Sequence, residues 1–330
     1  MKNFKKAIDI ICIGEVLVDF FAVQSGVKFR EVEEFRRIAG GAPANVAVGA
    51  SRLGRNTAFI GRVGADEFGF YLRDILVENK VNVEMLQFDR QARTGLAFIS
   101  LPTPTTREIL FYRNPGADMN LDWKDFNVSL LKNTQILHFG SITLISKISK
   151  ESTLKAVLSA KEAGAIISYD PNLRVDLWPD MVTAKKQIID VLPLADVIKV
   201  NNEELEFITG ISNFKKGAEK LLKKGIKICI VTLGEKGAFY LTDYFSGIMP
   251  TFDVETIDST GCGDSFTAGL LSFLVNVSLE NLIANREEMT SIIKTATAAA
   301  SLTSMKKGVI PSLPYKSEVE AFMSGNFLKV

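Results

Sequence analysis

An alternation of short apolar segments with longer segments of helical spacing, from residue 136 to residue 232, constrains the fold most strongly. Strands that follow one another through helices make right-handed crossovers, so they lie parallel in one sheet that helices bury on both faces. The alternation therefore predicts an α/β protein whose central sheet is mainly parallel. The predicted strands are 136–139, 166–170, 197–200 and 227–232, and the predicted helices are 151–163, 181–191 and segments within 203–224.

The carboxyl ends of these strands carry polar residues and glycines. In open parallel sheets, ligands bind beyond this edge. We therefore expect a binding site that draws on Asp170, Asn172, Arg174, Asn201, Glu204, Thr232 and Gly234.

The first part of the chain is less regular. Residues 8–13 form an apolar strand candidate, and residues 17–23 continue as a second one carrying Asp19, whose charge must meet water or a ligand. The glycines and proline of 40–43 mark a turn into a helix of small residues that ends near Gly54. A strand at 57–60 and an amphipathic helix at 67–78 follow.

Residues 95–101 and 108–113 are predicted to form a β-hairpin that stands apart from the alternation. A polar, proline-bearing connection at 102–106 separates the two strands. Towards the C-terminus, the sequence predicts a helix of small residues at 292–302, a loop at 306–312 and a last short helix from about 315.

The stretch 258–271 is the strongest candidate for chemistry. Gly261 and Gly263 precede Asp264 and a mostly apolar segment with helical spacing, which predicts a loop that opens a buried helix. Free N–H groups and the positive end of the helix dipole make such a start an anion site, with Asp264 in the first turn beside the anion. Alternatively, the glycines form only a tight turn and Asp264 only caps the helix.

Composition and charge exclude several classes of protein. The chain has 330 residues, with 39 Lys and Arg against 38 Asp and Glu, and this balance gives no reason to expect a nucleic-acid partner. Its 3 cysteines include no CxxC pair, so we expect a reduced, cytoplasmic protein. Charges interrupt the apolar run at 8–21, so we expect neither a signal sequence nor a membrane span.

Familiar catalytic motifs are missing from the sequence, including the P-loop, the kinase HRD and DFG set, GxSxG and HExxH. His138, the only histidine, ends an apolar strand and is expected to be structural. Asn201 and Glu204 have a spacing that suits a hydrated Mg²⁺, or else an ordinary helix start. Arg174 could bind a phosphate or carboxylate, or form a structural ion pair.

Several motifs in order resemble the ribokinase-like (pfkB) family of sugar kinases, and within it the bacterial fructokinases. The resemblance covers almost the whole chain, so it implies one ribokinase-like catalytic domain over 1–330. The motifs are Gly40-Gly41 with Asn45, Asn201-x-x-Glu204, Thr232-Leu233-Gly234, the Asp264 stretch, FYRNPGADM at 111–119, SYDPNLR at 168–174 and KKGVIPSLP at 306–314.

The resemblance implies ATP-dependent phosphorylation of a sugar hydroxyl. Asp264 is then the general base, and the N–H groups of Gly261, Cys262 and Gly263 form the anion hole. Arg174 completes the implied catalytic set. The implied sugar contacts are Asp19, Gly40, Gly41, Asn45, Phe98, Tyr112 and Arg113. The implied nucleotide and Mg²⁺ contacts are Asn201, Glu204, Thr232, Gly234, Gly237 and Thr297, and Asp258, Thr260, Gly308 and Ser312 match a site for a monovalent cation such as K⁺.

The family also implies a β-strand lid over the sugar, built here from about 18–37 and from 95–113. Apolar lid residues such as Phe20 and Phe98 motivate the hypothesis of a homodimer formed through the lid. Three positions depart from the family pattern, namely Cys262 for the usual Ala, Thr297 for Asn with Ala300 for Gly, and Gly116 for Ser.

Other activities remain open at this point. Within the family, 2-keto-3-deoxygluconate kinase is the alternative to fructokinase, because it too uses an arginine at the Arg174 position. Its lid carries Tyr-x-Arg, however, whereas Tyr112 and Arg113 are adjacent here. An alternative of another class is a non-catalytic sugar or nucleotide sensor, although a sensor would be expected to have lost the base or the glycines.

Overall fold

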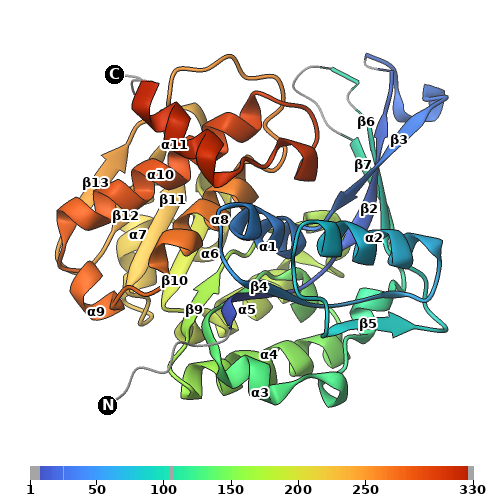
Figure 1. Cartoon of the computed structure of the whole chain (residues 1–330), viewed down its shortest axis with the longest axis horizontal. Helices are drawn as coiled ribbons and strands as arrows, with labels where there is room; N and C mark the ends of the chain where they lie inside the picture. The colour runs from blue at the N-terminus through green and yellow to red at the C-terminus, as the bar shows by residue number, and fades with distance from the viewer. Residues whose placement is uncertain (1–7, 25, 101, 104–107, 326–330) are drawn as a thin grey trace.

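A nine-stranded sheet forms the centre of the molecule, with the strand order β13-β12-β11-β10-β9-β8-β1-β4-β5 (Figure 1). The computed structural model describes residues 8–24, 26–100, 102–103 and 108–325. Neighbouring strands from β5 to β11 pair in parallel, and β12 and β13 extend one edge in antiparallel fashion. The strands are β1 (Ile8–Ile13), β4 (Thr57–Gly64), β5 (Leu86–Asp89), β8 (Thr134–Phe139), β9 (Ile166–Tyr169), β10 (Val197–Asn201), β11 (Ile228–Thr232), β12 (Ala238–Leu241) and β13 (Ser246–Met249).

The chain builds this sheet outward from β1 in both directions. It first adds β4 and β5 on one side and then adds β8 to β11 on the other. The order therefore reverses between β1 and β8, and parallel sheets place their ligands at the carboxyl edge of such a switch point. This edge is where the sequence predicts the site.

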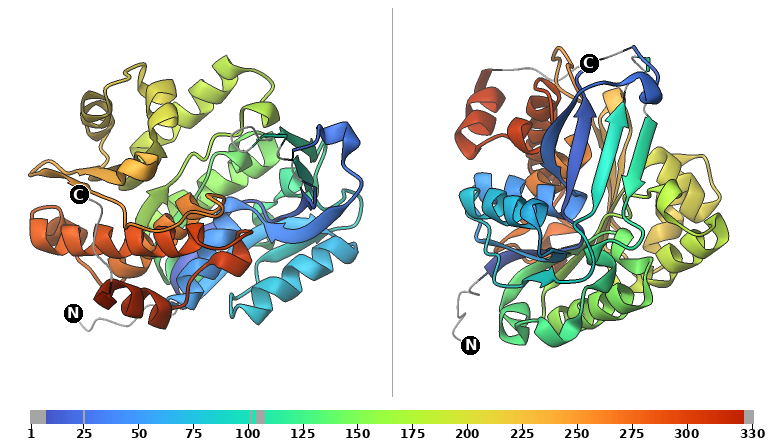
Figure 2. Two further views of the ribbon diagram at one scale, coloured as in Figure 1. Left: turned by 90° about the horizontal axis from the view of Figure 1, so that it is seen from above. Right: turned by 90° about the vertical axis from the view of Figure 1, so that its right-hand side faces the viewer.

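Helices cover both faces of the sheet, as predicted (Figure 2). Alternate residues of β1 enter different cores, because Ile10 and Cys12 face one helical layer while Ile11 and Ile13 face the other. The first layer contains α1 (Ala42–Arg52), α2 (Glu67–Glu78), α8 (Cys262–Leu274) and α10 (Arg286–Ser304), with α9 (Leu279–Leu282) and α11 (Lys316–Gly325) beside it. The second contains α3 (Val128–Lys132), α4 (Lys147–Glu162), α5 (Met181–Asp190), α6 (Asn202–Thr209) and α7 (Phe214–Leu222).

A separate four-stranded sheet stands at one end of the main sheet, with the order β3-β2-β6-β7 (Figures 1 and 2). The predicted hairpin is confirmed, since β6 (Leu96–Ser100) and β7 (Glu108–Tyr112) pair in antiparallel fashion. Residues 101 and 104–107, which include part of the predicted connection, lie outside the described residues. The other two strands are β2 (Leu17–Ala22) and β3 (Phe35–Gly40).

Some element boundaries differ from the prediction. The sequence did not predict β3 as a strand, because the exposed Arg36 and Arg37 interrupt its apolar pattern. Two helices start earlier than predicted because polar residues cap them upstream of their apolar faces. Ser146 caps α4 through the Ser149 N–H, and Asn285 caps α10 through the Glu288 N–H. Strands β5, β12 and β13 are short and were also not predicted.

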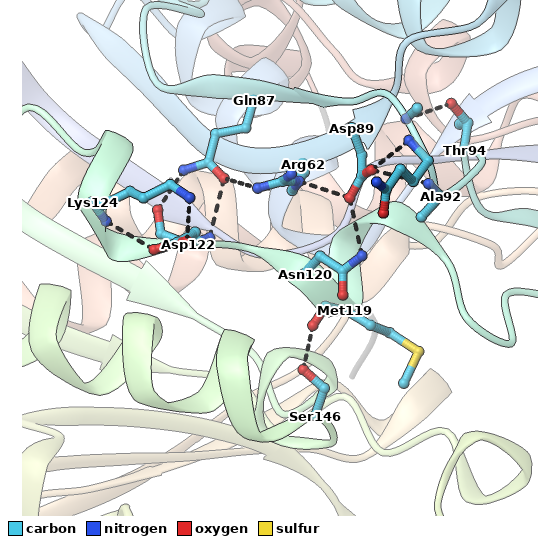
Figure 3. Close-up of polar contacts among 12 residues, drawn as sticks. Arg62, Gln87, Asp89, Ala92, Thr94, Met119, Asn120, Asp122, Lys124 and Ser146 are labelled. Carbon is cyan, nitrogen blue, oxygen red and sulfur yellow. Dashed lines mark hydrogen bonds and ion pairs between the residues drawn. The ribbon is translucent and has the colours of Figure 1, made fainter.

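A polar network fastens the segment that returns from the four-stranded sheet to the main sheet (Figure 3). Arg62 of β4 donates to Asp89 and Gln87 of β5. Asn120, which follows β7 in the chain, donates to the same Asp89 carboxylate at 3.0 Å. The segment that follows the four-stranded sheet is thereby held against β4 and β5. Among the described residues, the structure contains no helix long and apolar enough to cross a membrane.

Candidate active site

The predicted glycine turn forms the start of α8. Gly261 precedes the helix with a φ of 82°, and a Cβ there would lie 2.5 Å from Cγ1 of Val309. The Cys262 N–H donates to the Ser259 carbonyl at 3.3 Å, so a turn contact engages one of the three predicted anion-hole amides. The first N–H groups of a helix have no acceptor within it, which leaves the first turn around Gly263 suited to an anion.

Asp264 lies in that first turn and meets a residue from the other end of the chain. Its Oδ2 accepts a hydrogen bond from Nδ2 of Asn45, in α1, at 2.8 Å. Burial raises the pKa of Asp264 to about 6, while the Asn45 hydrogen bond and the Lys199 charge act in the opposite direction. A carboxylate with this pKa is ionised at neutral pH yet can accept a proton, as a general base must.

A second glycine turn starts α1 on the facing side. Gly41 has a φ of 107°, and a Cβ there would lie 2.5 Å from the Glu15 carbonyl oxygen. The Ala42 N–H donates to the buried Glu15 carboxylate at 3.1 Å. A Cβ on Gly40 would lie 2.1 Å from Oδ2 of Asp19, so this predicted sugar contact lies directly across the turn.

A small cavity lies between the two turns at the switch point. Its volume of about 10 Å³ suits one water molecule. Glu15, Ala42, His138, Ser141, Asp170 and Asp264 are among its lining residues. His138 is buried, its Nδ1 lies 3.0 Å from the Ser168 hydroxyl, and burial lowers its pKa to about 4. It is therefore neutral at pH 7 and hydrogen-bonded within the core.

A larger cavity of about 640 Å³ opens on the other side of the α8 start, within the size range of small-molecule sites. Every residue predicted for the nucleotide side lines it except Glu204. These residues are Asn201, Thr232, Gly234, Gly237 and Thr297, and Cys262 and Gly263 line it too. The start of α8 thus separates the two cavities, with Cys262 and Gly263 on the larger one and Asp264 on the smaller one.

Glu204 and Asn201 form a capping box at the start of α6. The Asn201 side chain accepts from the Glu204 N–H, and the Glu204 carboxylate accepts from the Asn201 N–H. The Leu173 N–H donates to the second Glu204 oxygen at 2.8 Å. The structure therefore contains the ordinary helix start that the sequence offered as the alternative to a Mg²⁺ site. No cluster of three or more His, Cys, Asp or Glu suits a metal within the described ranges.

The four residues predicted for a monovalent cation come together beside α8. The Asp258 carboxylate accepts from the Thr260 N–H at 2.9 Å and from the Gly308 N–H at 3.2 Å. The Ser312 hydroxyl donates to the Gly308 carbonyl. Carboxylate, hydroxyl and carbonyl oxygens are the donor types that hard cations take.

The predicted residues of the lid and of the strand ends differ in exposure. Phe98 stacks on Phe20 with ring centroids 4.8 Å apart, while Tyr112 is 61% exposed. Arg113 is buried, and its guanidinium is paired with Asp118. Arg174 donates to the Asn172 side chain at 2.6 Å. The positive charge of Arg113 is therefore balanced by the Asp118 carboxylate.

Sequence reasoning missed Lys199. This residue lies inside the buried strand β10, and its Nζ is 2.9 Å from Oδ2 of Asp170. The available signal was a lysine in the apolar run 197–200, because lysine is almost never fully buried without a partner.

Comparison with known proteins identifies the family. The family model described as "pfkB family carbohydrate kinase" matches residues 7–316 of the chain. The chain belongs to this family. A pfkB carbohydrate kinase is a phosphotransferase that acts on a sugar hydroxyl, so the chain is an enzyme of this class.

The relatives of this pfkB kinase include several fructokinases. It is 43% identical to probable fructokinase-4 of Arabidopsis thaliana over 318 residues, which is 96% of this chain and 97% of that protein. It is 44% identical to fructokinase-2 of Solanum lycopersicum, covering 96% of each.

Solved structures confirm the ribokinase-like fold. The fructokinase of Xylella fastidiosa with bound ATP superposes with a TM-score of 0.87 at 30% identity, covering 97% of this chain and 99% of that one. A Vibrio cholerae fructokinase with fructose, ADP and calcium bound superposes with a TM-score of 0.86 at 32% identity. The match covers 96% of this chain and 99% of that one.

Proposed function

We propose that the protein is a fructokinase, which transfers the γ-phosphoryl group of ATP to D-fructose and forms D-fructose 6-phosphate and ADP. The observation that carries this proposal is the position of Asp264, in the first turn of α8 between the small cavity and the 640 Å³ cavity. The fructokinases among its relatives support fructose as the acceptor.

In the proposed reaction, Asp264 takes the proton of the sugar hydroxyl as the oxygen attacks the γ-phosphorus. The new O–P bond forms, the bond from phosphorus to the β–γ bridging oxygen breaks, and ADP leaves with that oxygen. Gly261, Cys262 and Gly263 stabilise the charge on the transferring group through their N–H groups at the start of α8, where the Cys262 N–H would exchange the Ser259 carbonyl for the phosphoryl group. Arg174, in the segment that follows β9, neutralises charge on the same group.

The sugar is proposed to lie over the α1 turn. Gly40 and Gly41 let it approach the backbone, while Asp19 and Asn45 hydrogen-bond to its hydroxyls. Phe98 and Tyr112 of the lid cover it, and closure of the lid would exclude water that competes for the phosphoryl group. Arg113 would hold the base of the lid in place through its ion pair with Asp118.

The nucleotide is proposed to occupy the 640 Å³ cavity. Thr232, Gly234 and Gly237 would contact its ribose and phosphates, and Thr297 would border the base. Asn201 and Glu204 would hold Mg²⁺ through water, which fits their free lone pairs and the few protein ligands that Mg²⁺ needs beside phosphates. When bound, Mg²⁺ supplies charge neutralisation to the phosphates.

A monovalent cation is proposed to bind Asp258, Thr260, Gly308 and Ser312. One Vibrio cholerae fructokinase structure contains a potassium ion with fructose and ADP, which supports K⁺ as the candidate. The oxygen donors present here fit such an ion. A dimer formed through the lid stays a hypothesis, and a monomeric mass by light scattering at micromolar concentration would count against it.

The buried pairing of Arg113 with Asp118 favours a neutral sugar over ketodeoxygluconate. An acid substrate needs a cation for its carboxylate, and this guanidinium is already neutralised. Coupled ADP release across fructose, ketodeoxygluconate, ribose, tagatose and adenosine tests the proposal. We expect fructose to give the highest kcat/KM, and a higher value for another acceptor would replace fructose as the substrate.

A further inference from the structure

Lys199 stands out because it is a charged residue in the middle of a buried strand. The whole residue is 8% exposed, and its neighbours Ile198 and Val200 are fully buried. Burying an ammonium is costly, and a buried ion pair seldom stabilises a fold more than well-packed apolar side chains would. Stability therefore gives a weak reason for this lysine, and its location suggests another one.

The ammonium of Lys199 reaches the start of α8. A Cβ on Gly263 would lie 3.0 Å from Lys199 Nζ, so this glycine leaves the space that the ammonium needs. Thr267 connects the same groups, because its hydroxyl lies 3.0 Å from the Gly263 carbonyl and 3.4 Å from Oδ2 of Asp170. Lys199, Asp170 and the first turn of α8 thus form one buried network.

The charge of Lys199 also acts on Asp264. Lys199 favours the ionised form of Asp264, and Arg174 adds to this effect while Asp170 opposes it. The titratable groups that face Asp264 or share its cavity are Lys199, Asp170, Arg174, Glu15, His138 and Cys262.

We propose that Lys199 is a positioning residue for phosphoryl transfer, whose fixed charge aligns Asp170 and the first turn of α8 and sustains Asp264 as the base. This inference rests on the proposed function, because it assigns Asp264 the role of base. The competing explanation is that Lys199 only neutralises Asp170.

The test compares Lys199→Met and Asp170→Asn, which break the same ion pair from opposite sides. The measurement is the profile of kcat/KM for fructose from about pH 5 to 8. The fall of kcat/KM at low pH, called the acid limb here, reports the pKa of the base in the free enzyme. We expect the limb to move up by about one pH unit in K199M and down in D170N, because Lys199 and Asp170 act on Asp264 with opposite sign. In K199M we also expect kcat to fall about 10-fold or more, with a smaller change in KM.

Movement of both limbs in the same direction, or of neither, would overturn the proposal. An unchanged kcat in K199M would overturn it too, because a lysine that only neutralises Asp170 would shift the limb without slowing phosphoryl transfer. If K199M does not fold, the double variant K199M/D170N leaves no unpaired charge from this ion pair and is compared with D170N. Its limb should lie above that of D170N, and coincident limbs would contradict the proposal.

Lys161→Met is the matched control. Lys161 donates to the Leu194 carbonyl and to Asp196, just before β10 begins and at the opposite end of that strand from the site. This variant removes a lysine ion pair from the same strand region, so kcat and the acid limb should stay unchanged. Failure of the fructokinase proposal would appear differently, as a wild-type protein that releases no ADP with fructose.

Discussion

Helices α1 and α8 each begin after a glycine with positive φ, on opposite sides of the switch-point cavity. The first turns of the two helices have different polar partners. At α1, a carboxylate of the protein already accepts from the first turn, since Glu15 binds the Ala42 N–H. At α8, the first turn borders the 640 Å³ cavity and carries the carboxylate Asp264 itself. The same backbone geometry therefore serves as an internal joint at α1 and as a candidate anion site at α8.

The helices also pack closely, which couples the two turns. A Cβ on Gly49 of α1 would lie 2.7 Å from Cβ of Ala268 in α8, so the helices approach at small residues. The Asn45–Asp264 hydrogen bond crosses the same contact. The comparison predicts that changes at α8 alter turnover, whereas changes at α1 alter stability and sugar binding.

The largest effect is expected from Asp264→Asn, which removes the base and keeps the shape of the turn. Turnover should fall by about 100-fold or more, because general-base catalysis contributes about 10²–10⁴-fold. Fructose binding, measured by calorimetry, should change little. Near-normal turnover in this variant would show that Asp264 is only a cap and would remove the functional difference between the turns.

The second effect compares Gly261→Ala with Gly41→Ala. Each places a Cβ 2.5 Å from another atom at a positive φ, so both should lose stability. We expect G261A to lower kcat by about 10–100-fold, because the clash with Val309 would displace the anion-hole N–H groups without removing one, and G41A to raise the fructose KM. Gly164→Ala is the control, because it has a φ of 78° and no atom within 4 Å. Equal kcat losses at both turns would contradict the comparison.

The third effect is the pH dependence of the wild-type enzyme. The base works when deprotonated, and the pKa of Asp264 is raised to about 6. Activity should therefore be full above about pH 7 and fall roughly tenfold per pH unit below about 6. A pH profile of kcat/KM for fructose measures this fall. A fall centred near pH 4 would mean that burial does not raise the pKa of Asp264.

The smallest effect concerns the stability of the α1 turn. Burial raises the pKa of Glu15 to about 7, so the folded state favours the protonated form, and stability is lost as the pH rises through 7. Glu15→Gln keeps an acceptor for the Ala42 N–H without the charge. It should be more stable than the wild type by about 1–3 kcal/mol at pH 8 and nearly equal at pH 4. Urea unfolding at both pH values measures the difference, and a less stable E15Q at pH 8 would refute it.

Much of the fold was readable because the periodic signals are local. The strand and helix spacing from 136 to 232 predicted the parallel sheet, and the proline-bearing connection predicted the separate hairpin. Strand β3 was missed because exposed arginines interrupt its pattern, and residues 286–291 of α10 were missed because its cap lies before its apolar face.

The sequence by itself determined which side chains and glycines were available and which strand ends they follow, because both depend on neighbours along the chain. Only the tertiary structure decided that Asn45 meets Asp264, that Arg113 is neutralised by Asp118, and that Lys199 reaches Gly263. These contacts join segments through the packing of α1, α8 and the sheet. Burial sets the pKa of Asp264, and burial exists only once the distant elements have come together.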